Sequence, residues 1–454
     1  MRELGQAESQ MNEREIRHIL SHRGVLPSRQ LGQNFLTDEA TAARIVSHLN
    51  LTPEDTVVEV GPGTGALTRH VVGRVKKLIL VEFDSRLAAA LKEKYSDVPE
   101  VEVVHQDAVE FDVRRLFAHR PIKFLGNLPY ASGGAIMKNF LSVPHPFRQA
   151  VIMLQKEVID RLSAQPGHED YGLLSLRVQS GWHVKTVMEV PPDVFYPVPQ
   201  VDSSVALLEP REDLPPFDRR LFDELLRRGF GQRRKQLHKL LPEGKDWGEL
   251  VTQLGVAKTV RAEELDLSQW LQITHFYDDH PLKEIPQKGT EMFDLVDDED
   301  QVIGQAMRSE IHAKDWKHRA VHVFVFNKRR DLLLQLRSRA KDKHPGVWDS
   351  SAAGHLDVGE RYEAAAIREL EEELGIHKDQ VIEVAKLPPS EATGWEFITL
   401  YAAQYQGALR YPCSEVDAVQ WFPMEVIEQW INNRPEDFAS GLIECWKAFR
   451  QQAS

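Results

Sequence analysis

Residues 57–65 read Val57-Val58-Glu59-Val60-Gly61-Pro62-Gly63-Thr64-Gly65, and this stretch decides the fold of the first part of the chain. An apolar run that breaks into closely spaced glycines is typical of a buried parallel strand that turns into a helix. Glycines at such a turn let the backbone approach a ligand without a clash from a Cβ atom. The spacing differs from the Gly-x-Gly-x-x-Gly fingerprint of dinucleotide-binding proteins, so a nicotinamide cofactor is not favoured. The stretch predicts an α/β sheet with a ligand loop at Gly61 and Gly63.

Three further apolar runs after the glycine loop each lead to a polar residue. The first, residues 78–81, ends at Glu82, where an acid can accept hydrogen bonds from ribose hydroxyls. The next two lead to Asp107, which could bind an adenine amino group, and to Asn127. Either acid taken alone would be interpreted as a helix cap or a solvated loop residue. Because doubly wound sheets bind ligands at the carboxyl ends of their strands, the set predicts one shared crevice.

The residues from 127 to 130 are Asn127-Leu128-Pro129-Tyr130, a string that indicates a reaction. The oxygen of the Asn127 side chain and the backbone carbonyl of Leu128 can both accept hydrogen bonds from the exocyclic amine of a base. These bonds localise the lone pair on the amine nitrogen, which is otherwise delocalised into the ring. Pro129 stiffens the turn, and Tyr130 offers a flat face for stacking. The string predicts methylation of a base amine, with Asn127, Leu128 and Tyr130 as catalytic residues.

Residues 21–275 resemble the ribosomal RNA adenine dimethyltransferase family, whose members use S-adenosylmethionine. The resemblance rests on the glycine loop, on the string at 127–130 and on four further strings, at residues 31–36, 155–158, 195–203 and 233–237. It implies a Rossmann-like methyltransferase sheet at 21–206. Apolar residues at three- and four-residue spacing, Leu221, Leu225, Leu226 and Phe230, predict a small helical C-terminal subdomain at 207–275. The polar residues 1–20 are expected to form an N-terminal extension. The sequence departs locally from the family at Ala131-Ser132-Gly133-Gly134, after the catalytic turn.

The same resemblance implies the site residues and the substrate. The family methylates two adjacent adenines near the 3′ end of small-subunit ribosomal RNA, forming N6,N6-dimethyladenosines during ribosome biogenesis. Tyr130 and Phe195 are expected to sandwich the flipped adenine. The residues expected to contact the methyl donor or the reacting amine are Asn34, Leu36, Gly61, Gly63, Glu82, Asp107 and Asn127.

A basic segment at 227–239 holds six Lys or Arg residues in thirteen positions and no acid. Phosphate contacts from such a cluster would give RNA affinity that weakens with salt, although a solvated basic helix face is the alternative. Residues 1–275 carry a formal net charge of −2 and residues 276–454 one of −11, so the acidity of the chain does not argue against RNA. The residues expected to bind RNA are Arg227, Arg228, Arg233, Arg234 and Lys235.

The chain of 454 residues is too long for one core, and a polar linker at 276–292 separates a second domain at 293–454. Residues 354–376 fit the pattern Gly-x5-Glu-x7-Arg-Glu-U-x-Glu-Glu-x-Gly-U, where U is aliphatic. This pattern resembles that of the Nudix hydrolase family and implies an α/β/α domain. It also implies water attack on a nucleoside diphosphate derivative, with Arg368 orienting Glu369.

Glu369, Glu372 and Glu373 lie at i, i+3 and i+4, so their carboxylates share one face of a helix. Such a cluster repels itself unless a hard cation neutralises it, which predicts Mg²⁺ or Mn²⁺ bound there with support from Glu360. A solvated acidic helix is the alternative. Three more acids, Glu391, Glu396 and Glu415, lie outside the pattern and are interpreted as structural.

The start of this second domain also resembles isopentenyl-diphosphate isomerases, at residues 302–304, 318–320, 334–337 and 345–348. Those enzymes need a catalytic cysteine just after the last of these segments, and Ser350-Ser351-Ala352-Ala353 stands there instead. The intact glutamate pattern therefore favours hydrolysis over isomerisation.

Two cysteines, Cys413 and Cys445, are too few for a disulfide framework or a cysteine zinc site, and they fit a reducing cytoplasm without disulfide-linked partners. No signal sequence or membrane-spanning run is evident, so no membrane partner is expected. Two hypotheses follow. The first is a bifunctional enzyme that acts on pre-ribosomal small-subunit RNA and on a nucleoside diphosphate derivative. The second is a ribosome-assembly RNA-binding factor in which methylation is secondary and the Nudix domain is regulatory.

Overall fold

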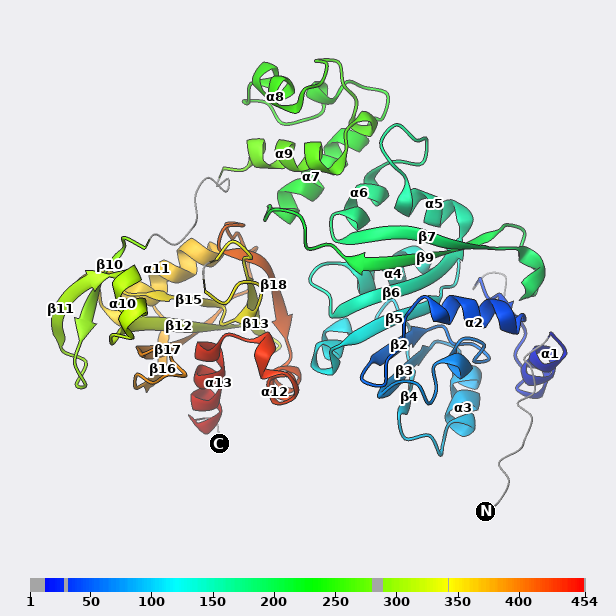
Figure 1. The fold of residues 1–454 in the computed structure, drawn as a ribbon, viewed down its shortest axis with the longest axis horizontal. Coiled ribbons are helices and arrows are strands. Elements are labelled where there is room, and N and C mark those ends of the chain that lie inside the picture. Colours follow the sequence, from blue (N-terminus) through cyan, green and yellow to red (C-terminus); the bar gives the residue numbers. More distant parts are fainter. Residues whose placement is uncertain (1–12, 28–31, 280–288, 342, 453–454) are drawn as a thin grey trace. The chain divides into compact units, whose positions relative to one another are not determined.

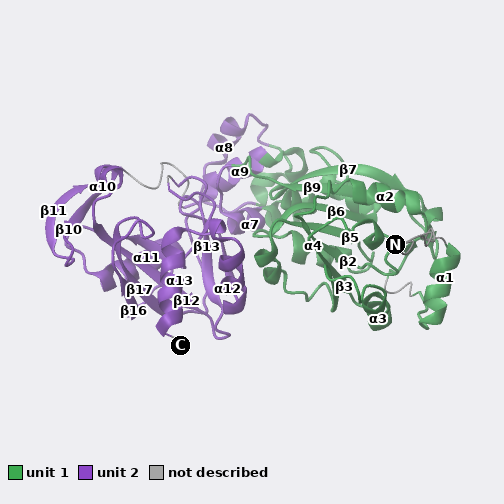
Figure 2. Ribbon diagram, turned by 60° about the horizontal axis from the view of Figure 1, so that its bottom comes forward, with its two compact units in different colours: residues 1–214, 226–240, 259–267 green, residues 215–225, 241–258, 268–454 purple. Residues whose placement is uncertain are grey.

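The computed structural model describes residues 13–27, 32–279, 289–341 and 343–452. The chain divides into two compact units (Figure 2). Unit 1 comprises residues 1–214, 226–240 and 259–267, and unit 2 comprises residues 215–225, 241–258 and 268–454. Most of the expected linker at 276–292 lies outside the described residues. The expected helical subdomain at 207–275 is shared between the units, so its boundaries stay a prediction.

Unit 1 is built on a seven-stranded sheet with the strand order β4-β3-β2-β5-β6-β9-β7 (Figure 1). The strands from β4 to β6 are parallel, whereas β9 pairs antiparallel with both β6 and β7. The order reverses at β2, which lies between β3 and β5 and therefore creates the crevice that doubly wound sheets use for ligands. The strands are β2 Thr56–Val60, β3 Lys77–Glu82, β4 Val101–His105, β5 Ile122–Asn127, β6 Phe147–Gln155, β7 Trp182–Val190 and β9 Ser203–Pro210.

Helices cover both faces of this sheet, and β2 shows why. Its five residues are all buried, with Val57 in one apolar core and Val58 and Val60 in the other. Helices α1, α2 and α3 contribute to the core around Val57, and α4 and α5 contribute to the opposite core. This arrangement confirms the predicted parallel α/β sheet. The α-helices up to β7 are α1 Glu13–His22, α2 Glu39–Ser47, α3 Ser85–Lys94, α4 Gly133–Leu141, α5 Lys156–Ser163 and α6 Leu173–Gln179.

Two short elements bring distant parts of unit 1 together. Strand β1 (Phe35–Leu36) pairs antiparallel with β8 (Phe195–Tyr196), across about 160 residues of sequence. Helix α1 lies partly within the expected N-terminal extension, and it buries Ile16 and Leu20 in the core around β2. Both contacts connect α1 and β1 to the apolar core of unit 1 that contains Val57.

A group of helices follows β9, and the apolar spacing at Leu221, Leu225 and Leu226 lies on the first of them. They are α7 Arg219–Phe230, α8 Trp247–Leu254 and α9 Leu267–Tyr277. Backbone hydrogen bonds also connect the segments between these helices, and one runs from Leu237 N–H to the Val260 carbonyl.

Unit 2 contains a second seven-stranded sheet, with the order β14-β13-β12-β17-β16, in which β15 also pairs with β12 and β18 with β13. A separate hairpin is formed by β10 and β11. The strands are β10 Met292–Val296, β11 Val302–Met307, β12 His318–Phe326, β13 Leu332–Arg337, β14 Trp348–Asp349, β15 Ala352–His355, β16 Ile382–Leu387, β17 Glu396–Gln404 and β18 Val416–Phe422. The helices are α10 Arg308–Lys314, α11 Tyr362–Leu374, α12 Met424–Asn433 and α13 Ser440–Gln452.

Strand β12 shows that the second sheet is covered on two sides. Val321, Val323 and Val325 belong to a core that includes apolar residues of α11. The alternate residue Phe324 packs against Trp446 and Phe449 of α13. Because neighbouring side chains of a strand point to opposite faces, the sheet lies between α11 and α13, which confirms the predicted α/β/α class.

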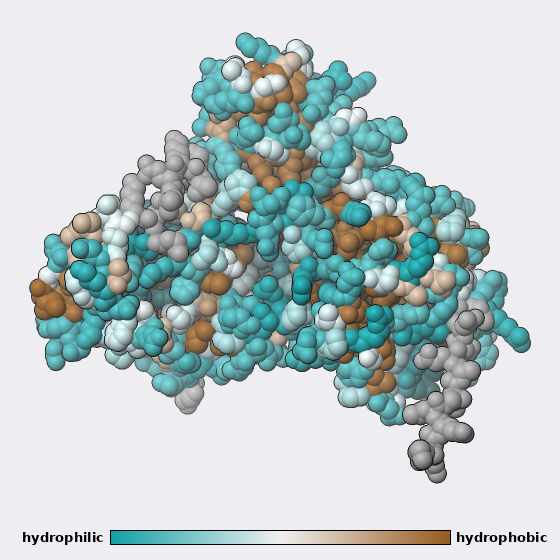
Figure 3. Space-filling view, viewed as in Figure 1, coloured by the Kyte–Doolittle hydropathy of each residue, from teal (hydrophilic) through white to brown (hydrophobic). Residues whose placement is uncertain are grey.

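The surface in Figure 3 is mostly hydrophilic, with apolar residues gathered in separate patches. Val302 and Ile303 on β11 are among the exposed apolar side chains. Within the described residues, no helix has both the length and the apolar character that crossing a membrane requires.

Candidate active sites

A cavity of about 240 Å³ opens at the carboxyl ends of the parallel strands of unit 1. It lies at the reversal of strand order, where the sequence predicts a ligand crevice. The structure brings together in its lining all the residues expected to hold the methyl donor and three of those expected to be catalytic. They are Asn34, Leu36, Gly61, Gly63, Glu82, Asp107, Asn127, Leu128 and Tyr130.

The glycine loop after β2 needs glycine for conformation as well as for space. Gly61 and Gly63 have φ values of +68° and +57°, which side chains rarely allow. A Cβ atom on Gly61 would lie 3.3 Å from the backbone oxygen of Asn127. The loop therefore packs directly against the turn that carries the predicted catalytic string.

Glu82 holds the end of β3 to this loop. One carboxylate oxygen accepts a hydrogen bond from Gly63 N–H at 3.0 Å, and the other accepts one from Asp84 N–H at 2.8 Å. Burial raises the pKa of Glu82, although these backbone hydrogen bonds act in the opposite direction. Glu82 is thus a brace for the glycine loop in addition to being an acid that lines the cavity.

Asp107 makes a hydrogen bond within its own turn and also lines the cavity. One carboxylate oxygen accepts a hydrogen bond from Val109 N–H at 2.8 Å, which is the turn-capping role expected of an isolated acid. The residue also lines the cavity beyond the end of β4. The local bond orients its carboxyl group without using all of its acceptor capacity.

Asn127 and Tyr130 are each fixed by one hydrogen bond. The Nδ2 atom of Asn127 donates to the backbone carbonyl of Asn34 at 3.2 Å, so Oδ1 is the end of the amide that can accept from a ligand. The Tyr130 hydroxyl and Ser203 Oγ lie 2.6 Å apart, and burial raises the pKa of Tyr130. Gly32 packs so closely that a Cβ there would lie 2.8 Å from Tyr130 N.

Phe195 is placed differently from the other predicted catalytic residues. It is 3% exposed, pairs with Leu36 across β1 and β8, and belongs to the apolar core of unit 1. It does not line the cavity beside Tyr130 in the described residues. The expected adenine sandwich between these two rings therefore stays a prediction.

Glu59 is a site residue to which the sequence assigned no role. It lines the cavity from β2 with its side chain almost completely buried. Burial raises its pKa to about 8, and the nearby charge of Glu82 acts in the same direction. The available signal was an acid inside an otherwise apolar strand, since burying a charge is costly unless it becomes neutral.

The basic segment at 227–239 is only partly available for RNA. The guanidinium of Arg233 bonds to the Glu263 carboxylate at 2.5 Å and to the carbonyls of Glu169 and Tyr171. These contacts give it a local structural role. Arg233 is nevertheless exposed, as are the other residues expected to bind RNA, Arg227, Arg228, Arg234 and Lys235.

A second group of predicted site residues lies on α11 in unit 2. The guanidinium of Arg368 donates hydrogen bonds to three predicted site carboxylates. The distances are 2.9 Å to Glu360, 2.7 Å to Glu369 and 3.1 Å to Glu372. A Cβ on Gly354 would lie 2.0 Å from an oxygen of Glu369, so the glycine makes room for that carboxylate. Burial, followed by repulsion from Glu373, raises the pKa of Glu369 to about 8. Arg368 therefore contacts three of the four glutamates of the pattern, and the fourth, Glu373, lies near Glu369.

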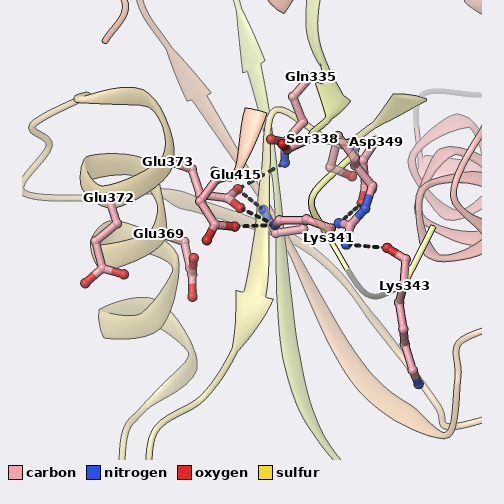
Figure 4. A network of polar contacts seen from close by, with 12 residues as sticks. Gln335, Ser338, Lys341, Lys343, Asp349, Glu369, Glu372, Glu373 and Glu415 are labelled. Atoms are coloured by element: carbon pink, nitrogen blue, oxygen red, sulfur yellow. Dashed lines mark hydrogen bonds and ion pairs between the residues drawn. The ribbon is translucent and has the colours of Figure 1, made fainter. Parts of the chain in front are cut away.

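Glu373 lies in a buried network shown in Figure 4. Its carboxylate accepts hydrogen bonds from Gln335 and from Ala353 N–H, each at 3.0 Å, and lies 3.3 Å from Lys341 Nζ. Lys341 also contacts Glu415 at 2.6 Å. Burial lowers the pKa of Lys341, but the two carboxylates outweigh that effect and raise it. The sequence missed Lys341 and Gln335, which lie outside the pattern.

The acids on α11 fit a hard divalent cation. Glu369 is buried close to Glu373, and repulsion between the two carboxylates adds to the effect of burial in raising the pKa of Glu369. Carboxylate oxygens are the ligands that Mg²⁺ and Mn²⁺ prefer. Two basic residues, Arg368 and Lys341, reduce the repulsion without removing it.

Comparisons with known proteins match both parts of the chain. A family model described as ribosomal RNA adenine dimethylase matches residues 27–279, and one described as NUDIX domain matches residues 316–440. A Geobacter metallireducens protein named ribosomal RNA small subunit methyltransferase A is 38% identical over 262 residues, covering 55% of this chain and 95% of that protein. A Bacillus cytotoxicus protein of the same name is 35% identical over 280 residues, covering 58% and 96%. The solved dimethyladenosine transferase of Plasmodium falciparum is 25% identical with a TM-score of 0.46, covering 53% of this chain and 95% of that one.

Proposed function

The chain belongs to the ribosomal RNA adenine dimethylase family, and from this premise we propose that it methylates N6 of two adjacent adenines in small-subunit ribosomal RNA. The adenines are those near the 3′ end, and the products are N6,N6-dimethyladenosines. The observation that carries the proposal is the cavity in which Asn127, Leu128 and Tyr130 meet the glycine loop and Glu82. The enzyme would act in the cytoplasm on RNA of the pre-ribosomal small subunit.

The residues around the cavity divide into two groups in this proposal. Bound S-adenosylmethionine supplies an electrophilic methyl group on sulfur. The residues proposed to hold the donor are Asn34, Leu36, Gly61, Gly63, Glu82 and Asp107. Glu82 has acceptor capacity left beside its two backbone bonds, so it can also bind ribose hydroxyls.

Asn127 and Leu128 prepare the nucleophile. Their side-chain and backbone carbonyl oxygens accept the two N–H groups of the adenine amine, which localises the lone pair on nitrogen. With the donor bound, the methyl carbon would pass from sulfur to this nitrogen as the carbon–sulfur bond breaks, and the extra proton on nitrogen would then leave to solvent. Tyr130 holds the plane of a base that has left its stack. Because the methyl group of the donor is already electrophilic, this reaction requires no strong acid or base. Catalysis then consists mostly of positioning the two reactants.

Label transfer tests this proposal. Wild-type protein should transfer tritium from labelled S-adenosylmethionine to undermethylated small-subunit particles, and Asn127→Ala should transfer at least about 100-fold less. Asn432→Ala, on the exposed end of α12, is the matched control and should retain full activity. Equal transfer by Asn127→Ala and wild type would refute the role of the amide.

We propose for the NUDIX domain a Mg²⁺- or Mn²⁺-dependent hydrolysis of a nucleoside diphosphate linked to another group. The metal would be held by Glu360, Glu369, Glu372 and Glu373, and when bound it would polarise the diphosphate for attack by water. Arg368 orients Glu369, since their side chains lie 2.7 Å apart.

Two neighbouring glutamates allow a matched test of this second activity. Glu372→Gln should abolish metal-dependent release from a panel of nucleoside diphosphate derivatives. Glu371→Gln changes the adjacent position, which lies outside the pattern, and should leave turnover unchanged. If Glu372→Gln turns over as fast as Glu371→Gln, the proposed metal role of Glu372 is wrong.

A further inference from the structure

Three histidines and a glutamate from four elements of unit 2 converge at a place separate from the glutamates of α11. His312 comes from α10, His318 from the start of β12, His355 from the end of β15 and Glu396 from the start of β17. The strand register explains the meeting, because His318 is paired with Glu396 and Ala320 with His355. We name these four residues the histidine cluster.

The distances within the histidine cluster suit one small ion. The ring nitrogens that face one another on the three histidines lie within 4.8 Å. Glu396 Oε1 lies 3.1 Å from His355 Nε2 and 3.5 Å from His318 Nε2. Tetrahedral zinc with bonds of about 2.0–2.1 Å holds its ligand atoms roughly 3.3 Å apart. The four side chains are therefore close to ligand spacing already.

The hydrogen bonding of His318 is typical of a histidine that binds a metal ion. Its Nδ1 lies 2.9 Å from the carbonyl of Trp316, and since a carbonyl can only accept, Nδ1 carries the proton and donates. The lone pair is therefore on Nε2, which faces the cluster. A hydrogen bond from the other ring nitrogen to a carbonyl is the usual support for a metal-binding histidine.

Two nitrogens of the cluster lack hydrogen-bond partners. The Nε2 atoms of His312 and His318 are buried and make no hydrogen bond within the part of the chain that the structure describes. His318 Nε2 and Glu396 Oε1 therefore do not form a hydrogen bond, although they lie 3.5 Å apart. His318 itself is 1% exposed. Burying a polar atom without a partner is costly, and a bound cation would remove that cost at both nitrogens.

We propose that His312, His318, His355 and Glu396 bind one Zn²⁺ ion, at a site separate from the catalytic cation of the NUDIX domain. Imidazole nitrogens suit zinc, whereas Mg²⁺ prefers a set made of oxygens. Four protein ligands complete a tetrahedron and leave no open position, which is the pattern of structural zinc. The ion would tie α10, β12, β15 and β17 together.

The zinc site would also steady the neighbouring glutamate pattern. The carbonyl of His355 accepts a hydrogen bond from Arg368 at 2.9 Å, and Gly354 next to it lies against Glu369. A ligated His355 would fix this end of β15, so the zinc ion would act on the hydrolase by positioning.

Metal analysis of the full chain tests the proposal. The chain, purified without a polyhistidine tag and given an excess of Zn²⁺ before desalting, should retain about one zinc per molecule by mass spectrometry, and excess Mg²⁺ should not displace it. Zinc content should fall at least about tenfold in His312→Asn and in Glu396→Gln. His377→Asn, an exposed histidine of the same unit, and Glu372→Gln should both retain zinc.

Cobalt substitution keeps the test decisive if a variant fails to fold. Co²⁺ bound by wild type should give the strong visible absorption of a tetrahedral site, and Zn²⁺ should remove it. A wild-type chain that retains less than about a tenth of an equivalent of zinc, or folded His312→Asn and Glu396→Gln variants that retain it all, would overturn the proposal. Loss of zinc in Glu372→Gln alone would place the ion on α11 and would overturn it equally.

Discussion

The side-chain nitrogen of Asn127 donates a hydrogen bond to the backbone carbonyl of Asn34, at a distance of 3.2 Å. This bond fixes which end of the amide is available to a substrate amine. Because Asn34 precedes β1 and Asn127 ends β5, the amide that we propose to be catalytic is oriented by a segment 93 residues away in sequence. The orientation of the Asn127 amide therefore depends on the segment before β1 as well as on the turn that carries Asn127.

Asn127→Asp should inactivate methyl transfer even though it keeps an oxygen acceptor. A carboxylate cannot donate to the Asn34 carbonyl and is repelled by it, so the side chain should turn away. We expect kcat to fall by at least about 100-fold, with a much smaller change in KM for S-adenosylmethionine. Steady-state methylation kinetics measure both. A variant with wild-type kcat would show that the bond to Asn34 is dispensable.

Glu82→Gln should weaken binding of S-adenosylmethionine. Both oxygens of Glu82 accept from backbone N–H groups, and a glutamine would turn a donor toward one of them. We expect Kd to rise by about tenfold or more, as for loss of a hydrogen bond to a charged group. Isothermal titration calorimetry gives the value, with the exposed Glu54→Gln as the control. Unchanged affinity would mean that the glycine loop keeps its shape without the brace.

Glu59 should make unit 1 less stable as pH rises. Its pKa is about 8 in the folded protein, against an ordinary value of 4.5, so the folded state holds a proton that the unfolded chain releases. The penalty is absent below pH 4.5, grows between pH 4.5 and 8, and amounts to about 1.4 kcal/mol for each unit. Glu59→Gln mimics the protonated form, so its melting temperature should fall less over this range. Parallel slopes for variant and wild type would contradict the burial argument.

Lys341→Met should lower thermal stability and enlarge the effect of Mg²⁺. The ammonium lies against Glu373 and Glu415, and its loss leaves the buried carboxylate of Glu373 and the half-buried one of Glu415 uncompensated. Breaking a buried ion pair from one side costs about 3–5 kcal/mol, which should reduce Tm by several degrees. Added Mg²⁺ should recover more of Tm than it adds to wild type. Lys328→Met, at an exposed position, is the control, and equal Mg²⁺ shifts in the two variants would refute this.

Gly354→Ala should separate the two activities. A Cβ at this position would lie 2.0 Å from the Glu369 carboxylate and would displace it. We expect nucleotide hydrolysis to fall at least about tenfold while methyl transfer is unchanged, because the methyltransferase cavity belongs to the other unit. Assays of both reactions on one preparation measure the difference. Gly134→Ala, where a Cβ would meet nothing within 4 Å, is the steric control.

The sequence predicted the cavity well because its residues sit at the ends of apolar runs. The carboxyl ends of parallel strands meet at one edge, so the run before Glu82 and the run before Asn127 bring these residues together without further information. The helical pattern of glutamates on α11 was equally readable from spacing.

Contacts between distant segments that lack a periodic hydrophobic pattern could not be predicted from the sequence. Strands β1 and β8 have two residues each, and they place Phe195 in the core beside Leu36. Arg233 looked like its basic neighbours, and its partner Glu263 is 30 residues away. The histidine cluster spans four elements with no recurring spacing, and the small number of cysteines gave no reason to expect zinc.

The pairing of β1 with β8 also bears on synthesis of the chain. Asn34 and Leu36 line the cavity, but the strand that holds them ends at Tyr196. A nascent chain cannot complete the donor site until residue 196 has left the ribosome, when the glycine loop has long been translated. The proposed donor site can therefore be complete only after nearly the whole of the first sheet has emerged.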